Sequence, residues 1–303
     1  MTKKILLTGG SGLIGSYFKE SYSSIFKDHK VLSPTHKEMD VTNLNSVKKY
    51  FEKNQPQIVI HFAAFRDATL AEKQRGDKAG SVWKVNVEGS RNIVKVCKEL
   101  KIYLIHISTD YVFSGHHKKP GPYFEKDETN HNSTLLSWYG VTKREAEIAV
   151  RDKLRDFAII RICNITRPLN NPKLDYIGKI LWLYDQNKIY PMFNDQLLTL
   201  TYIPSLVESI IKLIRLKLSG VFHVSTNDLV IPVDLAQYLI KKAGNKKINI
   251  QGISIDNYLR LNPRRYPKNG GLSVGLTQKK LGLDFGSWKD AVDSYVKDIN
   301  KRK

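Results

Sequence analysis

The chain has 303 residues, and its 41% hydrophobic and 26% charged content is typical of a globular protein with an ample core. Its two cysteines cannot build a disulfide framework, and no apolar run approaches the roughly 18 residues of a membrane helix, so we expect a cytoplasmic protein without a membrane segment. The net charge of +20 comes from scattered lysines rather than one basic block, which argues against nucleic-acid binding and suits anionic small molecules.

Short apolar segments alternate with helical segments through the first half of the chain. We predict strands at residues 4–8, 29–33, 57–64, 102–109 and 157–163. The first predicted helix ends near residue 27, and others cover 43–53, with Asn43 as its cap, 81–100 and 138–153. Continuous apolar strands are typical of a parallel sheet that is buried on both faces. The alternation therefore predicts an α/β fold with a doubly wound parallel sheet.

After about residue 165 the alternation becomes irregular. The turn-rich stretch 167–175 leads into predicted helices at 174–187, 204–218, 232–243 and 287–301, with a strand at 220–226. No low-complexity linker separates the two parts, so we expect them to pack together. The first domain should comprise residues 1–168 and about 200–226, and a smaller C-terminal portion about 169–199 and 227–303.

A glycine-rich turn follows the first predicted strand and opens the first helix. Gly9, Gly10, Gly12 and Gly15 fit both the Gly-x-x-Gly-x-x-Gly and the Gly-x-Gly-x-x-Gly spacing. Glycines let the backbone approach a pyrophosphate, and the helix N-terminus presents N–H groups to it. This context predicts a Rossmann-type first domain that binds a dinucleotide, whereas a purely structural turn is the alternative. The other expected cofactor contacts in the turn are Ser11, Leu13 and Ile14.

The segment after the second predicted strand bears on the choice of cofactor. No acidic residue follows that strand directly; His36 and Lys37 come first, and cations there suit the 2′-phosphate of NADP. NADP is therefore at least as well supported as NAD. The alternative is that His36 and Lys37 are ordinary exposed loop residues. Asp40 and Val41 come next and are expected near the adenine. The remaining expected cofactor contacts are Ala63 and Ala64, small residues that close the third strand and that core packing explains equally well.

Tyr139 and Lys143 lie four residues apart at the start of the helix predicted at 138–153, so they share one helix face. A nearby ammonium lowers the pKa of a phenol, and a phenol that exchanges protons near neutral pH can act as a general acid or base. Taken alone, the pair fits an exposed helix surface better. The glycine turn earlier in the chain favours the catalytic interpretation.

Several motifs occur in the order and approximate spacing of the extended short-chain dehydrogenase/reductases. They are TGGSGLIG, DVT (40–42), HFAA (61–64), VNVEG (85–89), STDYVFSG (108–115) and YGVTK (139–143). STDYVFSG resembles the dTDP-4-dehydrorhamnose reductase group in particular, and NDQLLTLTY (194–202) and, loosely, residues 266–282 resemble the same group. The resemblance is strong over residues 1–165 and thin beyond. It implies NAD(P)H-dependent reduction of a 4-keto sugar nucleotide, with a deoxysugar as the expected sugar.

The resemblance also implies roles for individual residues. Tyr139 matches the acid–base group, Lys143 the lysine that lowers its pKa and holds the nicotinamide ribose, and Thr109 the hydroxyl that binds the substrate oxygen. Asp110 and Tyr111 would border the sugar. The other expected substrate residues are Asn164 and Gln196. No metal-ligand spacing is present in the sequence, and the habit of the superfamily favours a homodimer.

Other activities fit the same scaffold. An epimerase would reuse the Tyr/Lys pair and keep its cofactor through the cycle, whereas a dehydratase would need a second acid where Tyr111 stands. A catalytically silent regulatory subunit of the same family is a third alternative, against which the intact catalytic residues argue. Three more side chains have two interpretations each. Arg161 is either a phosphate ligand or part of a salt bridge, and His61 and His106 are more simply explained as core residues than as ligands.

Overall fold

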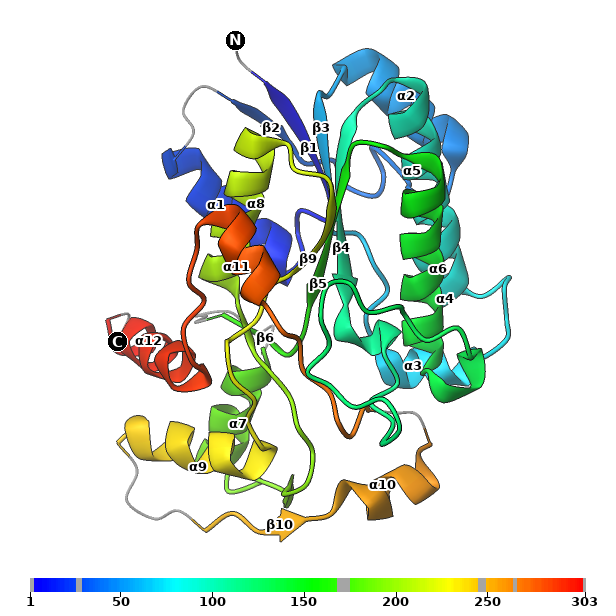
Figure 1. Cartoon of the computed structure of the whole chain (residues 1–303). Coiled ribbons are helices and arrows are strands. Elements are labelled where there is room, and N and C mark those ends of the chain that lie inside the picture. The colour runs from blue at the N-terminus through cyan, green and yellow to red at the C-terminus, as the bar shows by residue number, and fades with distance from the viewer. Residues whose placement is uncertain (1–2, 26–28, 168–174, 245–248, 264–265, 302–303) are drawn as a thin grey trace. The chain divides into compact units, whose positions relative to one another are not determined.

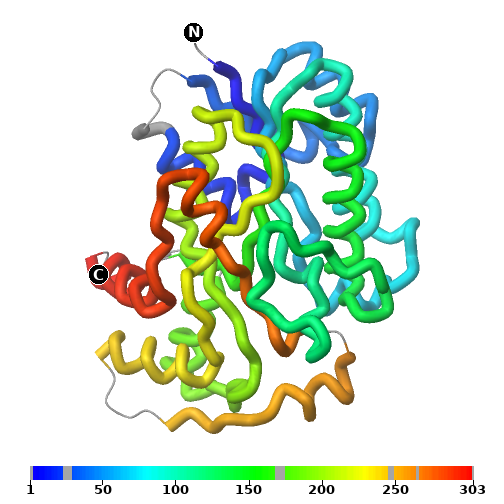
Figure 2. Tube along the Cα trace, viewed as in Figure 1, coloured from blue at the N-terminus to red at the C-terminus, as the bar shows by residue number. Residues whose placement is uncertain are grey.

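The computed structural model describes residues 3–25, 29–167, 175–244, 249–263 and 266–301. The chain divides into two compact units, each assembled from three separate stretches, which can be followed by colour along the trace in Figure 2. Unit 1 comprises Met1–Val112, Thr129–Arg161 and Val207–Phe222, and unit 2 comprises Phe113–Glu128, Ile162–Leu206 and His223–Lys303.

A six-stranded sheet with the order β2-β1-β3-β4-β5-β9 forms the centre of unit 1. β1 pairs in parallel with β2 and with β3, and β3 pairs in parallel with β4. The strand order reverses between β1 and β3, which is the place where doubly wound sheets bind ligands. The predicted fold class is confirmed. The strands are β1 (Lys4–Thr8), β2 (Lys30–Leu32), β3 (Ile58–His61), β4 (Tyr103–Thr109), β5 (Phe157–Ile162) and β9 (Gly220–His223).

Helices cover both faces of this sheet. α2 (Leu44–Asn54), α5 (Gly89–Glu99) and α6 (Trp138–Lys153) lie on one face, and α1 (Leu13–Ile25) lies on the other with α8 (Ile203–Leu216) (Figure 1). The predicted cap is present, because Asn43 accepts a hydrogen bond from the Ser46 N–H. The short helices and turns of unit 1 are α3 (Ala68–Lys73), α4 (Ser81–Trp83), η1 (Lys84–Glu88), η2 (Asp110–Val112) and η3 (Ser133–Leu135).

The helix predicted over residues 81–100 is present but is not uniform. α4 and α5 are joined by η1, one π-helical turn over Lys84–Glu88. Single π turns inside helices frequently mark functional sites. Here the turn contains Asn86, whose buried side chain contributes to the site described below.

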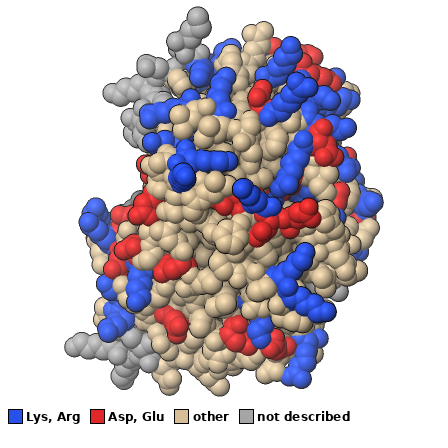
Figure 3. All heavy atoms as spheres, in the orientation of Figure 1, with Lys and Arg blue, Asp and Glu red and all other residues tan. Residues whose placement is uncertain are grey.

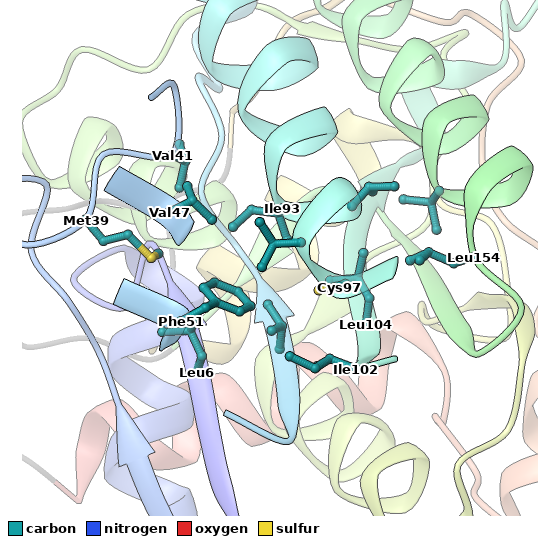
Figure 4. Close-up of a cluster of buried hydrophobic side chains, with 14 of the residues drawn as sticks. Leu6, Met39, Val41, Val47, Phe51, Ile93, Cys97, Ile102, Leu104 and Leu154 are labelled. Atoms are coloured by element: carbon teal, nitrogen blue, oxygen red, sulfur yellow. The ribbon is translucent and has the colours of Figure 1, made fainter. Parts of the chain in front are cut away.

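The core beneath α2 and α5 explains why the apolar pattern of the strands is continuous. Leu6 of β1 and Leu104 of β4 face Phe51 of α2 and Ile93 of α5, as Figure 4 shows, and all four side chains are buried. Cys97 lies in the same cluster, where burial raises the pKa of its thiol. Burial of such side chains contributes roughly 1.5–3 kcal/mol each, which fixes the sheet as a rigid platform.

The described part of unit 2 contains short strands and five helices. β6 (Ile165–Thr166) pairs in parallel with β8 (Thr201–Tyr202), and β7 (Met192–Phe193) with β10 (Gly252–Ile253). A buried apolar cluster that includes Ile177, Leu200, Leu239 and Val292 forms its core. The helices are α7 (Tyr176–Asp185), α9 (Pro232–Lys242), α10 (Ile255–Leu261), α11 (Gly275–Leu281) and α12 (Trp288–Asn300).

The division by contacts differs from the predicted domain boundaries. The ranges 113–128, 162–168, 200–206 and 223–226 were expected in the first domain, but they group with unit 2. The largest difference is at residues 113–128. The reason is backbone pairing: the Tyr123 N–H donates to the Gly271 carbonyl, and the Ser273 N–H donates to the Tyr123 carbonyl. Within the described ranges, no helix is both long and apolar enough to cross a membrane.

Candidate active site

The glycine turn between β1 and α1 is compact because several of its positions have no room for a side chain. Gly9 has a positive φ of 67°, and a Cβ atom there would lie 2.8 Å from the Ala63 backbone nitrogen. A Cβ atom on Gly15 would lie 2.7 Å from both the Gly10 Cα and the Gly9 carbonyl oxygen. The Gly12 N–H donates to the Gly9 carbonyl and closes the turn. The first turn of α1 therefore stands at the carboxyl edge of the sheet, a geometry that fits a pyrophosphate.

We expect Gly15→Ala to weaken NADPH binding by at least about tenfold, because the added methyl group would force the turn open and displace its N–H groups. Fluorescence titration of NADPH measures the change. Gly275→Ala is the matched control, since a Cβ atom there meets nothing within 4 Å and should leave affinity unchanged. Equal affinity of Gly15→Ala and the wild type would remove the turn from the cofactor site.

The loop after β2 carries the residues expected near the adenosine. His36 and Lys37 are exposed, and the His36 Nδ1 lies 3.6 Å from the Asp40 Oδ1. Asp40 accepts hydrogen bonds from both the N–H and the hydroxyl of Thr42 at 2.8 Å, so its carboxylate organises the loop. Val41 is buried. Two exposed basic side chains at this edge fit a 2′-phosphate.

A buried chain of hydrogen bonds ties the glycine turn to the neighbouring strand and helix. The Ala63 N–H donates to the Thr8 hydroxyl oxygen, and the Thr8 Oγ1 lies 2.7 Å from the His61 Nδ1. The His61 Nε2 lies 3.1 Å from the Ser90 Oγ, which donates its own proton to the Asn86 carbonyl. Burial lowers the pKa of His61 to about 3, so the ring is neutral. In this series of hydrogen bonds only the His61 tautomer with its proton on Nε2 satisfies every partner, because Nε2 must donate to Ser90 and Nδ1 must accept from Thr8.

The same network reaches the helix that carries the Tyr/Lys pair. The Asn86 side chain receives the Phe65 N–H and donates to the Phe65 carbonyl, and its amide also donates to the Thr142 hydroxyl oxygen. Thr142 in turn donates to the carbonyl of Tyr139. His61 is thus a satisfied buried histidine that links β1, β3, α5 and, through Asn86, α6.

Tyr139 and Lys143 lie one turn apart at the start of α6, whose N-cap Ser137 accepts the Gly140 N–H. The Tyr139 ring packs edge-on against Tyr111 with centroids 5.7 Å apart. Lys143 is buried, and its Nζ donates to the Ile107 carbonyl at 2.7 Å. Burial lowers the pKa of Lys143 to about 8.

The expected effect of the ammonium on the phenol is wrong. The pKa of Tyr139 is raised, chiefly by burial and then by the Asp110 carboxylate, against the opposing effects of a hydrogen bond with Thr109 and of Arg66. Lys143 is not among these causes, and its ammonium donates to the Ile107 carbonyl of β4. Tyr139 therefore holds its proton at neutral pH, which is the form that a proton donor needs.

Thr109 and Asp110 stand together where β4 ends. The Thr109 hydroxyl donates to the Asp110 Oδ1 at 3.1 Å and accepts the Tyr111 N–H at 3.3 Å. Both side chains are buried, and burial raises the pKa of Asp110 to about 7 against the hydrogen bonds that it accepts. Unit 1 thus brings Thr109, Asp110, Tyr111 and Tyr139 into one group.

The two expected substrate residues of the later chain belong to unit 2 and make hydrogen bonds within that unit. The Asn164 Nδ2 donates to the Thr199 carbonyl at 3.0 Å, and Asn164 has a positive φ of 32°. The Gln196 Nε2 donates to the Pro267 carbonyl at 3.1 Å. Each of these side chains thus connects two loop segments of unit 2 through a hydrogen bond to a backbone carbonyl. Among the described residues, no group of three or more His, Cys, Asp or Glu side chains is arranged to hold a metal ion.

Comparison with known proteins places this site in a family. Residues 3–301 match the family described as the RmlD substrate binding domain. The chain belongs to this family. The predicted resemblance is confirmed, and the match extends over the later residues, where the motifs were thin.

Relatives and solved structures agree with this assignment. The chain is 29% identical over 245 residues to dTDP-4-keto-6-deoxy-D-glucose reductase of Streptomyces niveus, covering 80% of each chain. It resembles the crystal structure of dTDP-4-dehydrorhamnose reductase from Bacillus anthracis in complex with NADP, with a TM-score of 0.85, 24% identity, and coverage of 97% of this chain and 99% of that one. It is also 31% identical over 165 residues to methionine adenosyltransferase 2 subunit beta of Bos taurus, covering 53% of this chain and 46% of that protein.

Two features of this RmlD-family site were not identified from the sequence. Arg66 was missed because it lies in a loop without a motif, and it acts on the pKa of Tyr139. Glu147 follows Lys143 by four residues, a spacing that could have flagged it. It is buried and binds Arg161 through two hydrogen bonds of 2.9 and 2.7 Å. The salt-bridge interpretation of Arg161 is therefore correct, in a buried rather than an exposed setting.

Proposed function

We propose that the protein is an NAD(P)H-dependent reductase of a 4-keto deoxysugar nucleotide, of the dTDP-4-dehydrorhamnose reductase type. One observation carries the proposal: a hydroxyl and a protonated phenol, Thr109 and Tyr139, stand together at the sheet edge that also bears the glycine turn. The names of the relatives in the same family support this substrate class.

Each residue of the site has a separate role in the proposed carbonyl reduction. A bound reduced nicotinamide supplies the hydride for the carbonyl carbon. Tyr139 donates its phenolic proton to the carbonyl oxygen, and the Thr109 hydroxyl donates a hydrogen bond to the same oxygen. Lys143, with a pKa of about 8, is mostly cationic at neutral pH, and its Nζ, anchored on the Ile107 carbonyl, would hold the nicotinamide ribose. The raised pKa of Tyr139 favours transfer of a proton only to an oxygen that becomes strongly basic, as an alkoxide is.

The cofactor and substrate contacts follow from the same placement. Gly9, Gly12 and Gly15 would hold the pyrophosphate, and His36 with Lys37 favours NADPH over NADH through the 2′-phosphate. Asp40 and Val41 would border the adenine, and Ala63 and Ala64 the nicotinamide side. On the substrate side we propose Asp110, Tyr111, Asn164 and Gln196.

Purified protein should oxidise NADPH when given dTDP-4-dehydrorhamnose or a related 4-keto-6-deoxy sugar nucleotide, measured by the absorbance of the reduced nicotinamide. Parallel assays with NADH test the cofactor preference. Product analysis should show one alcohol formed for each NADPH consumed. Tightly bound cofactor with no net consumption, and a sugar product of inverted configuration, would instead establish an epimerase.

A regulatory subunit is the second candidate, favoured by the similarity of 165 residues to methionine adenosyltransferase 2 subunit beta. The presence of buried Thr109 and Lys143 together with the partly buried Tyr139 argues for catalysis. The absence of turnover across a panel of keto sugar nucleotides, with normal NADPH binding, would favour the regulatory function.

We further propose a cytoplasmic homodimer that binds neither nucleic acid nor membranes. Cys97 and Cys163 are both free thiols, as suits a reducing compartment. On the face drawn in Figure 3, lysine and arginine side chains are mixed with acidic and uncharged ones and form no continuous basic surface. Sedimentation of the purified protein, alone and with duplex DNA, tests the dimer and the lack of nucleic-acid binding.

A further inference from the structure

We propose that Asp110 is a positioning residue that decides where the Thr109 hydroxyl directs its single proton. The inference rests on the proposed reductase function and deepens it. The two side chains are adjacent and buried, and the Thr109 Oγ1 lies 3.1 Å from the Asp110 Oδ1. The same Oγ1 accepts the Tyr111 N–H at 3.3 Å.

Counting protons shows why this contact matters. A hydroxyl has one proton to donate and two lone pairs, and the Tyr111 N–H occupies one of the lone pairs. Thr109 also interacts with the Tyr139 phenol, but in the reaction the phenol directs its proton to the substrate carbonyl, which leaves the second lone pair of Thr109 open to Asp110. An ionised carboxylate only accepts, so it takes the Thr109 proton and leaves none for a substrate carbonyl. A protonated Asp110 can donate to the Thr109 oxygen instead, and the Thr109 proton is then free to point at the carbonyl. The protonation of Asp110 therefore switches Thr109 between two roles.

The surroundings of Asp110 place this switch in an accessible pH range. Burial raises the pKa of Asp110 to about 7. The titratable side chain that faces it from α6 is Tyr139, whose pKa is raised by the Asp110 charge and lowered by Arg66 of the loop after β3. From β4, His106 is neutral because burial lowers its pKa well below the usual value, and Lys143 is bonded to the backbone carbonyl of Ile107.

Two effects of ionised Asp110 act in the same direction. It removes the Thr109 proton from the carbonyl, and its charge disfavours the phenolate that Tyr139 becomes after proton transfer. Because Asp110 is neutral below its pKa, reduction should be fast at low pH and slow down as pH rises through about 7. Loss of one such donor typically lowers kcat by about 10²-fold.

The test is the pH profile of NADPH-dependent reduction between pH 5.5 and 9, with kcat and KM measured separately. In the wild type, kcat should fall across a step centred near pH 7, whereas the KM for NADPH should change little. Asp110→Asn should lose this step, because an amide does not titrate and its N–H can still donate to Thr109. Thr109→Ser should keep the step, and Thr109→Val should shrink it because no hydroxyl remains to be switched.

The outcomes separate the inference from the proposed function. An active wild type whose step persists unchanged in Asp110→Asn overturns the inference alone. A wild type that oxidises no NADPH with any keto sugar nucleotide overturns the proposed function, and the inference falls with it. If Asp110→Asn does not fold, the comparison of Thr109→Ser with Thr109→Val decides, because equal steps in these two variants would contradict a switch that acts through the hydroxyl.

Discussion

Replacing Tyr139 with phenylalanine should lower kcat for keto-sugar reduction by about 10³-fold or more while NADPH affinity changes little. General acid catalysis by a positioned side chain contributes roughly 10²–10⁴-fold, and Tyr139 is the protonated donor beside Thr109. The variant keeps the ring that packs against Tyr111, so the site should keep its shape. Steady-state NADPH oxidation gives kcat, and fluorescence titration gives the affinity.

Tyr111→Phe is the matched control for this experiment. It removes a phenolic hydroxyl from the other ring of the same edge-on pair, whose centroids lie 5.7 Å apart. We expect it to change the KM for the sugar nucleotide more than kcat. If Tyr139→Phe keeps more than a tenth of the wild-type kcat, or if Tyr111→Phe loses as much, Tyr139 is not the proton donor.

Breaking the buried ion pair between Glu147 and Arg161 should destabilise unit 1 by about 3–5 kcal/mol in free energy of unfolding. Arg161 is fully buried and Glu147 is 2% exposed, so Arg161→Met leaves a buried carboxylate whose remaining ionic partner is Arg151 at 3.3 Å. Denaturant unfolding measures the loss. The double variant Glu147→Met/Arg161→Met should recover part of the stability, because it removes both charges of the pair from the core, although buried Lys143 then lacks the Glu147 charge.

The exposed pair Lys48–Glu99, with an N–O distance of 3.2 Å, is the control for this prediction. Lys48→Met should cost at most about 1 kcal/mol, because surface ion pairs contribute little. Similar losses for Arg161→Met and Lys48→Met would contradict the importance of burial. Glu147 also raises the pKa of Lys143, so Glu147→Gln should lower that pKa below about 8 and reduce the cationic fraction at neutral pH.

Sequence patterns correctly predicted those strands and helices whose bounds are set by residues close to them in the sequence. β1 and α6 have the predicted bounds, because an apolar run before a glycine turn and a serine cap before a helix are local signals. The glycine spacing likewise predicted the turn that the structure shows. Helical periodicity also placed Tyr139 and Lys143 on neighbouring turns.

Features that depend on distant parts of the chain could not be predicted. Lys143 and Tyr139 share a helix face, yet the ammonium bonds to the Ile107 carbonyl of β4, and burial followed by the Asp110 charge raises the phenol pKa instead of lowering it. Residues 113–128 join unit 2 through backbone pairing near residue 271, which no local pattern encodes. The roles assigned to Thr109 and Tyr139 stay predictions until the variants are measured.

The series of hydrogen bonds through His61 has a consequence for how the Tyr139 phenolate regains its proton after each turnover. Both His61 nitrogens are committed, and an additional proton on Nδ1 would face the Thr8 hydroxyl, whose oxygen already receives the Ala63 N–H. The ring consequently cannot relay a proton through the interior of the sheet. The phenolate must therefore recover its proton by a route that does not pass through His61, and Asp110, whose pKa is raised to about 7 and whose charge acts on Tyr139, is an acid that the site itself supplies.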